Sequence, residues 1–137
     1  MTRINLRLYV NPGEAEVTFS LQLQDQTYER VTGTVDTGAE VSLLPNYLLH
    51  KIGIASDEQL DSFIIDQAGI ANQSFSATPA SVNLFLEDSH GNRTGVFEVP
   101  VWFADTEIAL IGFAGILDRS ILHIDMPQRI GWLEIDA

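Results

Sequence analysis

The sequence predicts an all-β fold in a single domain spanning residues 1–137, and two patterns support this. Apolar residues alternate with polar ones in many short stretches, which is the period of a strand with one buried face. Clusters of Asn, Asp, Gly and Pro separate these stretches, as in β proteins with tight turns. The chain has 137 residues, 45% of them hydrophobic, which suits one domain with a buried core.

The first part of the chain predicts a hairpin followed by a longer strand. Alternation over Ile4–Val10 resumes at Val17–Leu23 after a turn at Asn11-Pro12-Gly13, so we expect a first hairpin there. A second turn at Asp25-Gln26 leads into a strand over Tyr28–Val35. This strand runs directly into an acidic loop.

The remaining elements follow from the same signals. Pro45 and Gly53 bracket apolar residues at helical spacing, which predicts a helix of two turns. Further along we expect a hairpin over Ser62–Ala77, a hairpin around Asp88–Asn92 with strands at Val82–Leu86 and Val96–Val99, a strand over Ile108–Ile111, a short helix over Gly115–Leu122 and a last strand over Ile130–Ile135.

Composition narrows the function classes. The formal net charge of −12, with no Lys/Arg cluster, argues against nucleic acid and anionic membranes as partners. The absence of Cys removes thiolate metal sites and is compatible with a reducing compartment, so we expect a cytoplasmic protein. The three His are far apart in sequence, and we expect neither a metal site nor a cofactor. No run approaches the roughly 20 apolar residues of a membrane-spanning helix.

The acidic loop is Asp36-Thr37-Gly38-Ala39. Such a triplet alone is an ordinary strand-terminating turn, so its surroundings decide its interpretation. It follows an apolar strand, is followed by Glu40-Val41-Ser42-Leu43-Leu44-Pro45, and is matched later by Leu110-Ile111-Gly112. Together these features resemble the retropepsin family of single-domain aspartic peptidases. The likeness covers Val17 to Ile135, and Val35 to Leu44 looks especially like the bacterial, non-viral members.

The resemblance implies a retropepsin-like acid-protease fold with closed, barrel-like sheets, a flap hairpin and one or two short helices. Asp36 would supply one carboxylate of a catalytic pair, because two such groups in contact share one proton. Thr37 would fix the pair by bonding the opposing loop, and Gly38 would let the substrate backbone approach. Ala39 lacks the hydroxyl that pepsin-like enzymes have there, so we expect a less acidic pH optimum than that of pepsin.

The chain has one such triplet, so the second Asp must come from another copy, and a C2 homodimer follows. The resemblance also assigns a flap tip at Gln67, Ala68, Gly69 and Ile70, with Leu110, Ile111 and Gly112 at the substrate pocket. The activity implied is endopeptidase cleavage of extended peptide or protein substrates, with the Asp36 loop and interleaved terminal strands, Ile4–Leu8 and Trp132–Ile135, at the interface. An alternative is that Ile4–Leu8 closes the core of its own subunit.

The sequence departs from the family pattern in two ways. Phe113 stands where retroviral members carry an Arg that pairs with the acidic residue at the position of Glu40, and Arg119 is a candidate substitute. The flap tip has a single Gly. These departures keep open a catalytically silent dimer that serves as a peptide-binding or structural module. An unrelated β-sandwich with a chance turn is the remaining alternative.

Overall fold

The computed structural model describes residues 1–53, 63–67 and 73–137, and they form an all-β structure. The helical elements in these ranges are one turn of α-helix, α1 (Asn46–Leu49), and one 3-10 turn, η1 (Leu117–Arg119). The strands are β1 (Thr2–Asn5), β2 (Arg7–Tyr9), β3 (Glu14–Gln22), β4 (Tyr28–Val35), β5 (Ser42–Pro45), β6 (Phe63–Gln67), β7 (Gln73–Glu87), β8 (Phe97–Ala104), β9 (Ala109–Ile111), β10 (Ser120–Asp125) and β11 (Ile130–Ile135).

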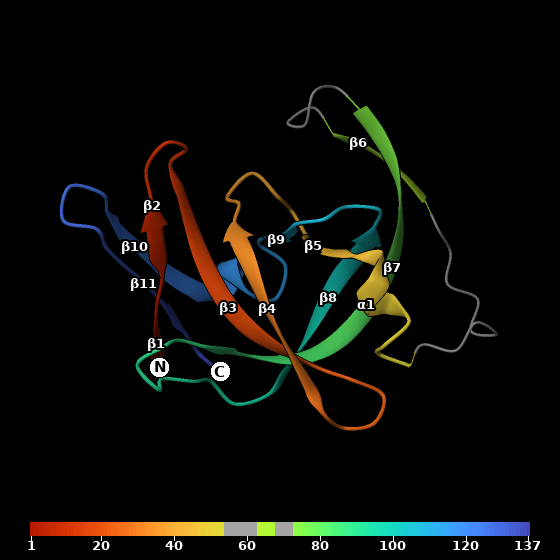
Figure 1. Cartoon of the computed structure of the whole chain (residues 1–137), viewed down its shortest axis with the longest axis horizontal. Coiled ribbons are helices and arrows are strands. Elements are labelled where there is room, and N and C mark those ends of the chain that lie inside the picture. Colours follow the sequence, from red (N-terminus) through yellow and green to blue (C-terminus); the bar gives the residue numbers. More distant parts are fainter. Residues whose placement is uncertain (54–62, 68–72) are drawn as a thin grey trace.

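The larger sheet closes on itself. Its order is β2-β3-β4-β9-β5-β8-β7-β6, and β3 also pairs with β7, so that β3, β4, β9, β5, β8 and β7 form a ring (Figure 1). The interior of the ring is filled by side chains that are at most 1% exposed, among them Phe19, Leu44, Leu84, Phe103 and Ile111. Closure leaves fewer free edges than an open sheet has. The predicted closed, all-β fold is confirmed.

A separate three-stranded sheet joins the two ends of the chain, in the order β1-β11-β10 (Figure 1). β1 pairs antiparallel with β11 from Thr2↔Ile135 to Asn5↔Trp132. Ile4, Leu133 and Ile135 are fully buried in the main core. Both chain ends are therefore paired within one chain. This agrees with the alternative in which Ile4–Leu8 closes the core of its own subunit.

Most predicted strands are confirmed. β4 and β11 have the predicted bounds, and the hairpins β2–β3, β6–β7 and β7–β8 lie where the turn residues indicate. One continuous strand was predicted over Ile4–Val10, and this is wrong, because the structure has two strands there, β1 and β2. At its middle the Leu6 N–H donates to the Gly131 carbonyl, after which the chain leaves β11 and Arg7 pairs with Glu16 of β3.

The two predicted helices need correction. The helix over residues 45–53 is one turn, and Ser42–Pro45 before it is a fully buried strand, β5, between β8 and β9. The prediction of a helix over Gly115–Leu122 is wrong. In that range only η1 is helical, and from Ser120 the chain pairs with β11. A non-local partner strand outweighs the local spacing of the apolar residues there.

Candidate functional site

Asp36 lies at the carboxyl end of a central strand. β4 pairs with β3 on one side and runs parallel to β9 on the other, with the last pair at Val35↔Ile111. The Asp36 N–H then donates to the Ile111 carbonyl at 2.9 Å. Pairing within the sheet therefore fixes the backbone at Asp36, and the Asp36 side chain lies where the strand ends.

The loop that follows is a tight turn around the Asp36 carboxylate. The Gly38 N–H donates to Asp36 Oδ1 at 2.9 Å, and the Ala39 N–H donates to the Asp36 carbonyl at 3.1 Å. Thr37 and Gly38 are exposed, whereas Asp36 is half-buried. The carboxylate is thus held in one orientation while the turn around it stays open to a ligand or a second chain.

The segment after β9 packs against the Asp36 loop and is hydrogen-bonded to it. Gly112 is buried, and a Cβ on it would lie 2.8 Å from the Ala39 carbonyl oxygen. The Phe113 N–H donates to that same oxygen at 3.0 Å, and the Ala114 N–H donates to the Glu40 carbonyl at 2.9 Å. The structure therefore brings the two sequence motifs into direct backbone contact, and only glycine fits at residue 112.

Ser42 also holds this contact, and sequence reasoning did not single it out. It is 1% exposed, and its Oγ accepts a hydrogen bond from the Gly112 N–H at 2.9 Å. A lone hydroxyl in the apolar run Val41-Ser42-Leu43-Leu44 is the signal that would have found it, because buried polar groups need partners.

The two predicted apolar pocket residues face opposite ways. Side chains alternate along β9, and Ile111, at 1% exposed, belongs to the main core. Leu110 is half-buried and packs in a second apolar cluster, whose other members are Leu43, Ala77, Trp102 and Ala104. Of the two, Leu110 is therefore the one with a surface that a ligand can touch.

The predicted flap hairpin starts at this second cluster. Ala77, in the cluster, pairs with Phe63 at the base of the β6–β7 hairpin, and Gln67 pairs with Gln73 at its far end. Gln67 is the last residue of β6. Ala68, Gly69 and Ile70 of the predicted tip lie outside the described residues.

The Arg that the family pattern requires is not replaced by Arg119. Its guanidinium donates to the Asp136 carbonyl and lies 5.3 Å from the Phe97 ring centroid. Within residues 1–53, 63–67 and 73–137, no ion pair joins Arg119 to Glu40. That hypothesis is wrong, and Phe113 itself is 41% exposed beside the loop.

No protein-family model and no curated protein matches the sequence. Solved structures do match, among them the crystal structure of a retropepsin-like aspartic protease from Rickettsia conorii. It superposes with a TM-score of 0.61 at 16% identity, covering 98% of this chain and 93% of that one. The chain has the retropepsin-like fold.

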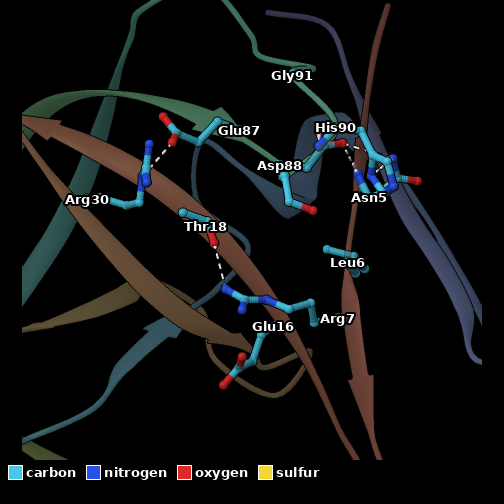
Figure 2. Close-up of a pocket in the computed structure, with 11 residues that line it drawn as sticks. Asn5, Leu6, Arg7, Glu16, Thr18, Arg30, Glu87, Asp88, His90 and Gly91 are labelled. Atoms are coloured by element: carbon cyan, nitrogen blue, oxygen red, sulfur yellow. Dashed lines mark hydrogen bonds and ion pairs between the residues drawn. The ribbon is translucent and has the colours of Figure 1, made fainter.

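The pocket shown in Figure 2 shares no residue with the Asp36 loop. This cavity of about 540 Å³ lies among β2, β3, β4 and the turn after β7. Its acidic groups already have partners: Glu87 accepts from Arg30 Nε at 2.7 Å and from Ser20 Oγ at 2.9 Å. The pocket is therefore a polar crevice whose side-chain bonds link β7 to β3 and β4.

Asp88, on the wall of the same crevice, ties the first strand to the β7–β8 turn. Its carboxylate accepts from the backbone and side chain of Asn5 at 2.8 and 2.9 Å. Partial burial raises the pKa of Asp88, but hydrogen bonds from Asn5 and Asn92 outweigh it. With a further bond from the His90 N–H, they hold the pKa at about 2.

The described part of the chain was compared with the requirements of a metal-ligand cluster and of a membrane-spanning helix, and it meets neither. It contains no group of three or more His, Asp or Glu placed to hold a metal ion. Among the same residues, no helix has the length and apolar content needed to cross a bilayer.

Proposed function

We propose that this protein is one subunit of a homodimeric aspartic endopeptidase of the bacterial, non-viral retropepsin kind. The observation that carries the proposal is the Asp36 carboxylate, held in an open turn at the end of a central strand and clamped against Gly112. The proposal takes residues 1–137 as one domain, in keeping with a core cluster that runs from Ile4 to Ile135.

The chemistry needs two copies of Asp36. Two carboxylates in contact share one proton, because ionising both would place like charges side by side. The ionised one takes a proton from a water, whose oxygen attacks the scissile carbonyl carbon. The protonated one donates a hydrogen bond to the carbonyl oxygen, where negative charge develops. Aspartic proteases are the standard case of such a pair.

The remaining residues would hold the substrate and the second loop. Thr37, which is exposed, would contact the opposing loop, and the exposed Gly38 would leave room for the substrate backbone. Leu110 and Trp102, both half-buried, offer apolar surface near the base of the β6–β7 hairpin. Such a surface suits apolar side chains of an extended peptide, which the hairpin would hold by main-chain hydrogen bonds. A cytoplasmic location remains part of the proposal.

The test compares wild type with Asp36→Asn on a diverse peptide pool between pH 3.5 and 7, with and without pepstatin. We expect pepstatin-sensitive cleavage that falls by about 10²–10⁴-fold in the variant. Equal unfolding temperatures would show that the variant is folded. No cleavage by a confirmed wild-type dimer would favour the catalytically silent alternative, which the exposed Phe113 in place of an Arg supports.

A further inference from the structure

We propose that the crevice in Figure 2 binds a free amino acid or a short peptide, with Arg7 holding the ligand's carboxylate and Glu16 holding its ammonium group. The chemistry shared by these ligands is a carboxylate and an ammonium group on one small molecule. The crevice shares no residue with the Asp36 loop, so the inference goes beyond the proposed function and does not depend on it.

The crevice has the size of a small-molecule site. Its volume is about 540 Å³, within the range of about 300–1,000 Å³ that such sites occupy. Glu16 and Thr18 lie on the outer face of β3, and Leu6 and Arg7 lie across from them on the first part of the chain (Figure 2). The turn at residues 88–91 forms a third side. Three segments that are far apart in the sequence thus surround one space.

Two of the three carboxylates on the crevice wall are already occupied. Asp88 accepts five hydrogen bonds from neighbouring backbone and side-chain N–H groups. A carboxylate has about four acceptor positions, so Asp88 has none left for a ligand. Glu87 forms an ion pair with Arg30 at 2.7 Å and accepts from Ser20 Oγ at 2.9 Å. Glu16 is therefore the carboxylate with which a ligand's ammonium group can pair.

Arg7 and Glu16 are neighbours that do not pair with each other. They lie directly opposite on β2 and β3, where Cβ atoms are about 5 Å apart. Within residues 1–53, 63–67 and 73–137, however, no ion pair joins them. The Arg7 guanidinium instead reaches across the crevice and donates to Thr18 Oγ1 at 3.3 Å (Figure 2). One positive and one negative group thus lie side by side without neutralising each other.

Both groups have capacity for a ligand. A guanidinium has five N–H donors that match a carboxylate in bidentate geometry, and the long bond from Arg7 to Thr18 uses one of them. A hydrogen bond with Glu16 raises the pKa of the Tyr9 hydroxyl, and this contact takes one of the acceptor positions of Glu16. Glu16 is half-buried, which strengthens its attraction for a cation. A ligand with both charges can therefore bind the two side chains at once.

The charge of the crevice favours a ligand without net charge. Two arginines and three carboxylates line it, which leaves a net charge of −1 with His90 neutral. The whole chain has a formal net charge of −12, so a simple anion is repelled. A simple cation would bind beside Arg7, which repels it. A zwitterion meets neither penalty.

The experiment titrates ¹⁵N-labelled wild type with four probes at neutral pH and follows amide chemical shifts. Glycyl-leucine has both charges, N-acetylglycyl-leucine has only the carboxylate, glycyl-leucinamide has only the ammonium group, and leucine is the free amino acid. The leucine side chain suits Leu6, the apolar side chain on the crevice wall. We expect saturable shifts at Leu6, Thr18 and Gly91 with glycyl-leucine at a Kd of about 1 mM or below. Both capped probes should bind at least about tenfold more weakly.

This comparison uses wild type alone, so it decides the question whether or not any variant folds. Equal affinity for either capped probe would overturn the inference, as would the absence of saturable crevice shifts up to about 20 mM glycyl-leucine. Affinity for leucine equal to that for glycyl-leucine would support the inference with a free amino acid as the ligand. Weaker affinity for leucine would support it with a short peptide.

Arg7→Gln and Glu16→Gln test the two assigned contacts. We expect each variant to bind glycyl-leucine at least about tenfold more weakly than wild type. Arg129→Gln and Glu98→Gln are matched controls, since they make the same charge changes at exposed positions outside the crevice and should leave the affinity unchanged. Wild-type affinity in either crevice variant would overturn the inference.

Asp36→Asn separates this site from the proposed active site. We expect the variant to bind glycyl-leucine with wild-type affinity, whether or not wild type cleaves peptides. Loss of binding in Asp36→Asn, or shifts confined to residues 109–112, would place the ligand at the Asp36 loop and overturn the inference. Failure of the peptidase test would leave the crevice site in place.

Discussion

Replacing Gly112 with Ala tests how the Asp36 loop is held. The added Cβ would lie 2.8 Å from three backbone atoms, the Ala39 oxygen and the carbonyl carbon and oxygen of Val41, whereas ordinary contact begins near 3.4 Å. The loop must therefore move by at least the difference between 3.4 and 2.8, which is 0.6 Å. It cannot do so freely, because the N–H groups of Asp36, Phe113 and Ala114 bond across this contact.

The expected cost is about 3 kcal/mol, the upper end for overpacking against atoms that cannot relax. For a chain of this size that lowers the unfolding temperature by about 10 °C, which differential scanning calorimetry measures directly. A displacement approaching 1 Å at a catalytic carboxylate costs about 100-fold in rate, so kcat/KM should fall by that factor even well below the unfolding temperature.

Gly13→Ala is the matched control. No atom lies within 4 Å of a Cβ at Gly13, and its φ is not positive, so we expect unchanged or slightly higher stability and unchanged cleavage. An unfolding temperature of Gly112→Ala within about 2 °C of wild type, with unchanged kcat/KM, would refute the view that the second motif clamps the first.

Two further substitutions test polar contacts. Ser42→Ala leaves the buried Gly112 N–H without its acceptor and should cost about 1–3 kcal/mol in urea unfolding, whereas the exposed Ser89→Ala should change stability by less than about 0.5 kcal/mol. Asp88→Asn should destabilise by about 1–2 kcal/mol at pH 7, discounted for the partly exposed carboxyl. Because the pKa of Asp88 is lowered from 3.8 to about 2 on folding, its contribution is present above pH 4 and is lost as the pH falls to about 2. The difference between wild type and Asp88→Asn should therefore shrink over that interval; a constant difference would show that the carboxylate charge is not what stabilises the turn.

Local pattern predicted much of the fold. β4 was predicted end to end because Tyr28–Val35 lies between a turn and the Asp36 loop, and β11 because Ile130–Ile135 has one buried face. β5 was missed because all four of its residues are buried, so no alternation reveals it. The helix predicted over Gly115–Leu122 failed because β10 exists through its pairing with β11, which no local signal encodes.

The candidate site divides in the same way. The sequence predicted Asp36 at a strand end and the Leu110-Ile111-Gly112 motif as its partner, and the structure places them in contact. The role of Ser42 depends on a bond across 70 residues of sequence, and the position of Arg119 depends on the C-terminal Asp136 carbonyl. Contacts that distant are fixed by the closed sheet and have no local pattern.

In the proposed peptidase, each active site contains Asp36 from both copies. Wild type and Asp36→Asn are mixed at constant total protein, allowed to exchange subunits, and assayed for peptide cleavage. If one site needs two intact carboxylates, activity follows the square of the wild-type fraction, so an equal mixture retains roughly one quarter of the activity. If each chain works alone, an equal mixture retains roughly one half, and that linear dependence would contradict the claim.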